Sequence, residues 1–171
     1  MSFLEILLFV FIGLLGLGLT FNSIGYFLPS TFEIKSELEV NAFQAEIKSK
    51  LFSVYGIKNW FYPSEDNPEI LITESFIEVN LKRGKVKFLI EEMNNSSKFS
   101  VRSNDKDSEN PDSMTALFTV ETEARKNCIS IKVTELFYLN KPGIRLLFKL
   151  HYKNAAEILH QKRLEKIRQL F

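Results

Sequence analysis

An almost unbroken apolar run near the start of the chain constrains its fold more than any other feature. Nearly every residue between Ile6 and Leu28 is apolar. A helix over these residues would be roughly 34 Å long at about 1.5 Å per residue, enough to cross a hydrocarbon core of about 30 Å. A lone segment in lipid must be helical, because only a helix satisfies its own backbone polar groups. The run therefore predicts one transmembrane helix.

Pro29 is expected to end this helix, because proline lacks a backbone N–H and disfavours helix in the residue before it. Two other interpretations are a buried core helix, which would need a larger protein, and a cleaved signal peptide. A signal peptide would have a positive start, but no Lys or Arg precedes Lys35. We expect an anchor at residues 1–30, contacting the lipid bilayer through residues 3–28, and one domain at residues 31–171.

The charges that follow the apolar run and the small residues within it bear on membrane orientation and on a protein partner in the membrane. Lys35, Lys48 and Lys50 follow it, so the positive-inside rule leans slightly toward a cytoplasmic domain on a single-pass membrane protein. Gly18, Asn22 and Gly25 share one helix face. That face is a candidate seam for a membrane protein partner, although glycine is also common in membrane helices without such a role.

The charge balance and the cysteine content exclude other classes. Lys and Arg number 22 and Asp and Glu 21, giving a net charge of +1, so no basic excess indicates a nucleic-acid partner. Cys128 is the single cysteine, so an intrachain disulfide is impossible.

The segment after the anchor begins with a strand and a short helix. Residues 31–40 alternate apolar and charged side chains, which is typical of a half-buried strand. Asn41 and Gln44 form a possible capping pair for an amphipathic helix over residues 42–54, which Gly56 is expected to end. Residues 60–63, Trp-Phe-Tyr-Pro, then predict an aromatic loop.

The remaining pattern predicts an antiparallel sheet closed by a long helix. Successive strands are expected at residues 70–81, 85–93, 98–103, 114–123 and 128–139, with a polar loop at 104–113. A helix is expected to start near Pro142. The stripe predicted to lie on the sheet contains Ile144, Leu147, Phe148, His151, Ala155, Ile158 and Leu159.

This order resembles the START-like superfamily, also called SRPBCC, which includes polyketide cyclase/dehydrase-type and pollen-allergen domains. The resemblance covers roughly residues 31–170. A membrane-anchored bacterial subgroup is resembled by residues 27–34, where an apolar helix ends in Leu-Pro-Ser and enters a strand, and by residues 38–43, 60–63 and 142–171. The chain departs from that subgroup at Asn41-Ala42, where a small residue and Pro are usual, and in having one loop Trp instead of two.

The resemblance implies an α+β helix-grip domain, a curved antiparallel sheet around a long C-terminal helix, with an apolar cavity between them. Such domains bind lipids, polyketides, sterols or quinones, and some are cyclases. The residues predicted to line the cavity are Trp60, Phe76, Phe88, Phe99, Phe118, Val133, Phe148, His151 and Tyr152. The alternative for each of them is a place in a filled core.

Catalytic and metal sites have little support in the sequence. His151, Glu135 and Arg102 are candidates for inward-facing polar groups, but no catalytic set is assigned. Residues 105–109 imitate the start of a calcium loop but lack its later Gly and Glu, and no zinc-type spacing occurs, so no metal or cofactor is predicted. The basic residues of the last helix either contact anionic headgroups or oppose the helix dipole.

The favoured hypothesis is a membrane-tethered binding or carrier module for an apolar small molecule of lipid, quinone or polyketide-like type. One alternative is a cyclase/dehydrase-type enzyme that uses His151 or Glu135. The other is a non-enzymatic accessory subunit of a membrane complex. An internal cavity of several hundred cubic ångströms would favour binding, whereas a filled core would favour the accessory subunit.

Overall fold

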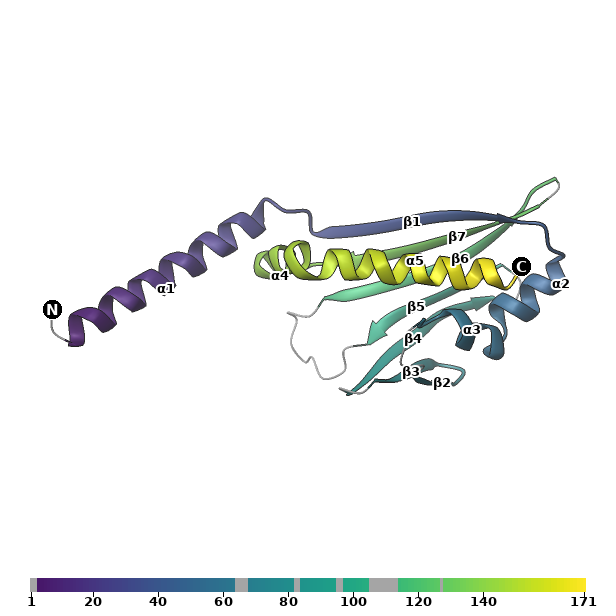
Figure 1. Cartoon of the computed structure of the whole chain (residues 1–171), viewed down its shortest axis with the longest axis horizontal. Helices are drawn as coiled ribbons and strands as arrows, with labels where there is room; N and C mark the ends of the chain where they lie inside the picture. Colours follow the sequence, from purple (N-terminus) through teal and green to yellow (C-terminus); the bar gives the residue numbers. More distant parts are fainter. Residues whose placement is uncertain (1–2, 64–67, 82–83, 95–96, 105–113, 127) are drawn as a thin grey trace.

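The chain forms a long N-terminal helix that projects from a sheet-and-helix domain (Figure 1). The structure, a computed structural model, describes residues 3–63, 68–81, 84–94, 97–104, 114–126 and 128–171. Helix α1 covers Phe3–Tyr26, and in this part of the chain it is the one helix long and apolar enough to cross a membrane. None of its most apolar stretch is buried, so α1 is not a core helix of this domain.

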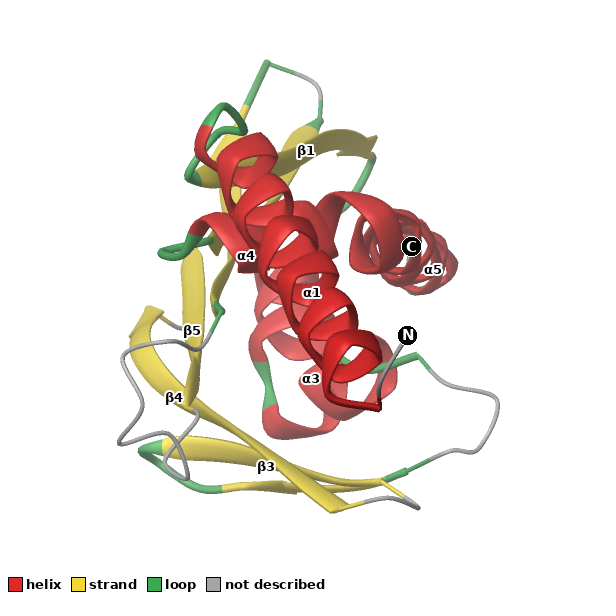
Figure 2. Ribbon diagram, turned by 90° about the vertical axis from the view of Figure 1, so that its left-hand side faces the viewer, coloured by secondary structure: helices red, strands yellow, loops and turns green. Residues whose placement is uncertain are grey.

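One antiparallel sheet of seven strands forms the body of the described domain. Its spatial order is β1-β7-β6-β5-β4-β3-β2. The strands are β1 Thr31–Val40, β2 Glu69–Ile72, β3 Phe76–Leu81, β4 Gly84–Asn94, β5 Lys98–Asn104, β6 Thr115–Ala124 and β7 Ile129–Tyr138. Figure 2 shows the sheet curving around the helices. This arrangement confirms the predicted α+β helix-grip fold.

Two groups of helical segments lie on the concave side of the sheet (Figure 2). The first contains α2 Gln44–Ile47, the π-helical segment η1 Lys48–Phe52 and α3 Val54–Trp60. The second contains α4 Pro142–Leu147, the π-helical segment η2 Phe148–Tyr152 and α5 Lys153–Gln169. The second group is the long closing helix that the sequence predicts.

The predicted strand over residues 70–81 is in fact a hairpin of β2 and β3. A turn at Thr73 reverses the chain, because the Thr73 hydroxyl accepts from the Phe76 N–H and donates to the Phe76 carbonyl, both at 3.1 Å. Ile72 then pairs with Ile77 and Glu69 with Asn80. Both halves alternate in the same way, so the local pattern does not reveal the reversal.

The first helical group differs from the single helix predicted over residues 42–54. Gly56 does not end it; Ser53 interrupts it and caps a new helix by accepting from the Gly56 N–H at 3.0 Å. A Cβ on Gly56 would lie 2.1 Å from the Lys50 carbonyl oxygen, so this glycine permits a close crossing of η1 and α3. Trp60, predicted in a loop, is the last residue of α3.

The buried face of the closing helix has a different phase from the predicted stripe. Leu147, His151, Ala155 and Ile158 are exposed. Three members of the predicted stripe are buried or half-buried as expected, namely Ile144, Phe148 and Leu159. From Phe148 onward, however, the series that follows the sheet is Phe148, Lys153, Ala156, His160, Arg163 and Ile167. The first step in this series is five residues, the spacing of a π-turn, and later steps are three or four. The π-turn adds one residue, which rotates the following face by about 100°.

A tight contact joins α1 to the closing helix, beside which it lies in Figure 2. Gly25 is the one buried residue of α1, and a Cβ there would lie 1.9 Å from the Pro142 carbonyl oxygen. A Cβ at Gly143 would lie 3.5 Å from the Asn22 side-chain oxygen. Asn22 and Gly25, suggested above as part of a seam for another membrane protein, thus pack against α4 of the same chain.

Candidate ligand-binding site

An open groove lies between the first helical group and the β2–β3 turn. It has a volume of about 830 Å³. Its lining residues are Ala45, Lys48, Ser49, Phe52, Ser53, Val54, Ile72, Thr73, Glu74 and Met93, and we call this feature the η1 groove. The helical segments that line it lie at the end of the domain away from α1 (Figure 1).

Local structure fixes the walls of the η1 groove. Phe52 is 1% exposed and belongs to the main core, while Ile72 and Met93 are half-buried against that core. The Ser53 cap places Val54 at the start of α3, where it is 49% exposed. The walls are therefore held by the core, while their surfaces remain open to a ligand.

The η1 groove has the chemistry of a site for an apolar molecule with one polar end. Half of its lining residues are apolar, three others carry hydroxyl groups, and Lys48 and Glu74 supply one charge of each sign. Small-molecule pockets usually measure about 300–1,000 Å³ and combine apolar walls with a few polar groups. The volume and lining of the η1 groove fall within that description.

The interior between sheet and helices is packed with aromatic rings. The Trp60 ring centroid lies 5.8 Å from that of Phe99 and 5.7 Å from that of Phe118. Phe61 packs edge-on against the same two rings, at 6.1 and 5.7 Å. The Trp60 indole N–H donates to the buried Leu51 carbonyl at 3.0 Å. Aromatic pairs with this geometry add packing energy beyond their buried area.

The structure thus brings together four of the residues predicted to line a cavity, all in the core. Trp60, Phe99 and Val133 are 0% exposed, and Phe118 is 5% exposed. Phe88 is half-buried and packs edge-to-face against Phe61, with centroids 5.1 Å apart. None of these five residues lines the η1 groove.

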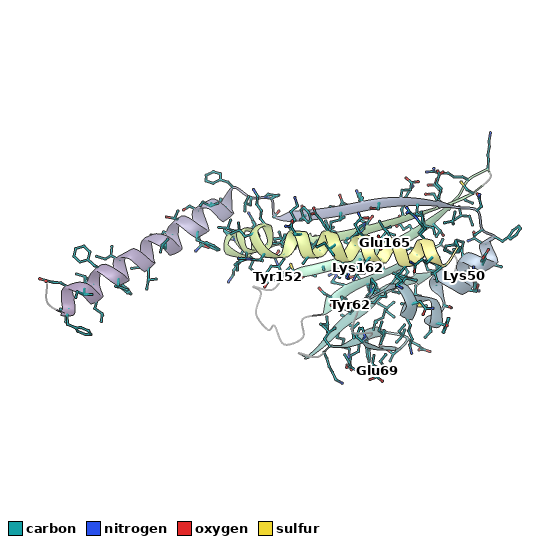
Figure 3. All side chains as sticks on the ribbon, viewed as in Figure 1. Lys50, Tyr62, Glu69, Tyr152, Lys162 and Glu165 are labelled. Carbon is teal, nitrogen blue, oxygen red and sulfur yellow. The ribbon has the colours of Figure 1, made fainter. Side chains whose placement is uncertain are left out.

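The other four predicted residues are scattered. Phe76 lies on the convex face, opposite to the prediction, because β3 turns Ile77 and Val79 inward; the Lys87 ammonium lies 3.5 Å from the Phe76 ring centroid. Phe148 packs in a smaller cluster with Phe32 and Phe137. Tyr152, labelled in Figure 3, is 55% exposed, and His151 is exposed too. The π-turn rotates these last two residues away from the sheet.

A buried polar network, not predicted as a set, crosses the interior beside the aromatic cluster. Arg163 donates to Glu135 Oε1 at 2.6 Å and to the Phe61 carbonyl at 2.6 Å. His160 Nδ1 lies 2.9 Å from the same Glu135 oxygen, and His160 Nε2 lies 3.0 Å from Ser36 Oγ. These bonds join β1, β7, the residue that follows α3, and α5. The sequence carries no signal for them, because the partners are distant in the chain.

The charges in this network set the ionisation of Glu135. Burial by itself would raise the pKa of the Glu135 carboxyl, but the Arg163 charge and hydrogen bonds from His160 and Arg163 together hold that pKa below its ordinary value near 4.5. Ser36, His160 and Glu135 have the connectivity of a hydrolase triad. However, Arg163 neutralises the carboxylate, His160 is 0% exposed, and none of the three lines the η1 groove, so the geometry favours a structural role.

No metal site is evident in the described part of the chain. Groups of three or more His, Cys, Asp or Glu that could hold an ion are absent there. The calcium-like stretch at residues 105–109 lies outside the described residues.

Comparison with known proteins identifies the fold. No protein-family model and no curated protein sequence matches the chain. Protein CV1439 of Chromobacterium violaceum aligns over 84% of this chain and 97% of its own, with a TM-score of 0.57 and 12% identity. A conserved protein of Geobacillus kaustophilus aligns over 81% and 93%, with a TM-score of 0.57 and 12% identity.

Truncated norcoclaurine synthase of Thalictrum flavum also aligns, over 78% of this chain and 91% of its own, with a TM-score of 0.52 and 14% identity. At these identities the likeness establishes a shared helix-grip fold and nothing about shared chemistry. The function must therefore be argued from the surfaces of this chain.

Proposed function

We propose that this chain is a membrane-tethered module that binds an apolar small molecule, of lipid, quinone or polyketide-like type, in the η1 groove. The groove carries the proposal, because it combines apolar walls held by the core with a volume suited to such a ligand. In this proposal α1 is the tether and residues 31–171 are the binding domain. The likeness in fold extends, by proposal, to membership of a membrane-anchored START-like group.

The position of the η1 groove bears on how such a module would work. The helical segments and the β2–β3 turn that line the groove lie at the end of the domain away from α1 (Figure 1). A ligand would then reach it from the aqueous phase or from a partner protein at that end, while α1 keeps the module at the membrane. This favours a carrier or sequestering role over direct extraction from the bilayer.

Neither of the two alternative residues of the enzyme hypothesis lines the η1 groove. Glu135 is engaged by Arg163 and His160 in the interior, whereas His151 is exposed on the outer side of the closing helix. The accessory-subunit hypothesis is favoured by one observation, the aromatic packing of the interior around Trp60.

Photolabelling with a small neutral aryl diazirine tests the binding proposal. The full chain is reconstituted in phosphatidylcholine vesicles, labelled, digested and mapped. We expect label at residues 45–54, from the η1 groove, and at residues 3–26, from lipid-exposed α1. The α1 label serves as an internal standard for the amount of probe.

A charged substitution separates the groove from general surface labelling. Val54→Glu places a carboxylate in the groove at the first turn of α3, where the helix dipole favours an acid, so the fold should persist. Tyr55→Glu adds the same charge at the adjacent position of the chain. The Tyr55 side chain is 78% exposed and does not line the groove. We expect Val54→Glu to lose groove label at least fivefold and Tyr55→Glu to keep it. Equal label in both variants would reject the groove as the binding site.

A further inference from the structure

A second, smaller hollow lies where α1 meets the domain. It has a volume of about 200 Å³. Its lining residues are Leu28, Pro29, Phe32, Leu139, Arg145, Phe148, Lys149 and Lys153, and we call it the joint pocket. Its apolar floor is part of the small cluster around Phe148, which is 3% exposed.

Three cations surround this apolar floor. The Lys153 ammonium lies 5.4 Å from the Phe32 ring centroid and 3.7 Å from Glu157, an exposed partner. Lys149 is exposed and has no ion pair within the described residues. Arg145 donates to the Leu139 carbonyl at 3.0 Å and to the Leu28 carbonyl at 3.3 Å, which leaves further guanidinium N–H groups for a ligand.

The connection between α1 and the domain sets the distance of the joint pocket from a bilayer. Leu28 and Pro29 follow Tyr26, the last residue of α1, and three residues span at most about 10 Å. The Gly25–Pro142 contact and the Arg145 bonds hold α1 against α4. Tyr26 and Phe27 expose 74% and 89% of their surface in this connection, and Leu150, which follows Lys149 in the chain, exposes 60%. If α1 spans a bilayer, the pocket lies at the headgroup level.

We infer that the joint pocket binds the headgroup of an anionic phospholipid from the surrounding bilayer. The phosphate would be held by Lys149, Lys153 and the free edge of Arg145, and the start of the acyl chains would lie on Leu28 and Phe32. Basic side chains near a lipid surface favour anionic headgroups, and the phosphate oxygens match their N–H donors. The inference rests on the proposed tethering by α1 but is independent of the η1 groove.

Thermal unfolding of the full chain in non-ionic micelles tests this inference. The micelles are doped with phosphatidylglycerol or, at the same mole fraction, with phosphatidylcholine. Trp60, the single tryptophan, is 0% exposed, so its emission reports loss of the core. A ligand that binds only the folded state raises the Tm. We expect phosphatidylglycerol, and not phosphatidylcholine, to raise the Tm by about 5 °C at saturation.

Paired variants locate the effect. Lys149→Gln with Lys153→Gln should abolish the rise caused by phosphatidylglycerol. Lys58→Gln with Lys166→Gln, which removes the same charge away from the joint pocket, should retain it. If the first pair fails to fold, Lys149→Gln alone removes the exposed cation and should at least halve the rise.

Three results would overturn the inference. The first is an equal rise in Tm with phosphatidylcholine. The second is a full rise in Tm with phosphatidylglycerol in the Lys149/Lys153 variant. The third is an equal rise with soluble glycerol 1-phosphate in undoped micelles, which would make free phosphate the ligand. Groove photolabelling that persists in any of these cases would leave the proposed function intact.

Discussion

Glu135, His160 and Arg163 place polar groups inside a domain whose other buried side chains are mostly apolar. Buried ions are costly unless they are paired and hydrogen-bonded, and here each member has partners on a different element. Replacing a whole buried ion pair by apolar residues is often tolerated, but removing one partner leaves an uncompensated charge. The network therefore constrains where α5 sits on the sheet more than it adds net stability.

Glu135→Gln is expected to lower the free energy of unfolding at pH 7 by about 3–5 kcal/mol, because Arg163 loses its buried partner. The folded-state pKa of Glu135 is lowered, so its stabilisation is fully present above the ordinary value near 4.5 and is lost as the pH falls through the lowered pKa. The difference in the free energy of unfolding between wild type and variant should thus stay constant from pH 7 to about 5. It should become smaller below that pH. Urea unfolding followed by Trp60 emission measures it.

Glu33→Gln is the matched control for this substitution. Glu33 pairs with Lys35 at 2.9 Å, and the two side chains are 41% and 66% exposed. Exposed pairs are screened by solvent and contribute little, so this variant should remain close to wild type. A pH-independent difference for Glu135→Gln, or an equal effect of both variants, would contradict a stabilising ionised Glu135.

At the scale of elements, the two π-helical segments stand out because each borders a hollow. Lys48, Ser49 and Phe52 of η1 line the η1 groove, and Phe148 and Lys149 of η2 line the joint pocket. π-turns insert a residue into a helix and are frequent at functional sites. In η2 the inserted residue also determines which face of α5 packs on the sheet. The same π-turn therefore shapes the joint pocket and sets the packing of α5.

Deleting Leu150, an exposed residue of η2, tests this account of the closing helix. The deletion removes the inserted residue, so Phe148 and Lys153 become four apart, as a regular helix requires, and the buried face of α5 keeps its phase. We expect the variant to fold with a Tm within about 5 °C of wild type.

Deleting Gln161, an exposed residue of α5, should behave differently. It brings His160 and Arg163 onto different faces of the helix and disrupts the network around Glu135. Loss of cooperative unfolding, read from Trp60 emission, is the expected result. If the Leu150 deletion unfolds the chain as fully as the Gln161 deletion, η2 is not a simple insertion.

At the scale of the molecule, α1 projects from the domain and contacts it near its C-terminal end, against α4 (Figure 1). The apolar surface of α1 is exposed along its length, with Leu4 79% and Leu17 69% exposed. Exposed apolar area on this scale is unfavourable in water and favourable in lipid. This surface is the physical basis for expecting the chain in a membrane.

Leu14→Arg with Leu15→Arg, at the centre of α1, should weaken membrane insertion by about 5–7 kcal/mol on the apparent insertion scale. Phe3→Arg with Leu4→Arg adds the same charge at the helix start, where the side chains can reach the headgroups, and should have a much smaller effect. The fraction of the chain that resists alkaline carbonate extraction measures the difference. Recovery of a membrane-free chain lacking residues 3–26 would instead favour a cleaved signal peptide.

Much of this architecture is encoded locally and follows from the sequence. The apolar run predicts α1, because insertion depends on the length and composition of one segment. Alternation predicts β1 and the order of hairpins, since antiparallel neighbours are joined by short turns. The candidate cavity residues were harder to place, because alternation identifies a face of a strand but not whether rings fill the space behind it.

The sequence by itself thus determined the apolar N-terminal helix, the antiparallel sheet and the closing helix, since each depends on the composition or periodicity of one contiguous segment. Only the tertiary structure decided the phase of α5, the Glu135–His160–Arg163 network, the aromatic filling around Trp60 and the positions of the two hollows. These features depend on how side chains from distant segments share one volume. A single extra residue in η2 rotates the buried face of the helix that follows it by about 100°.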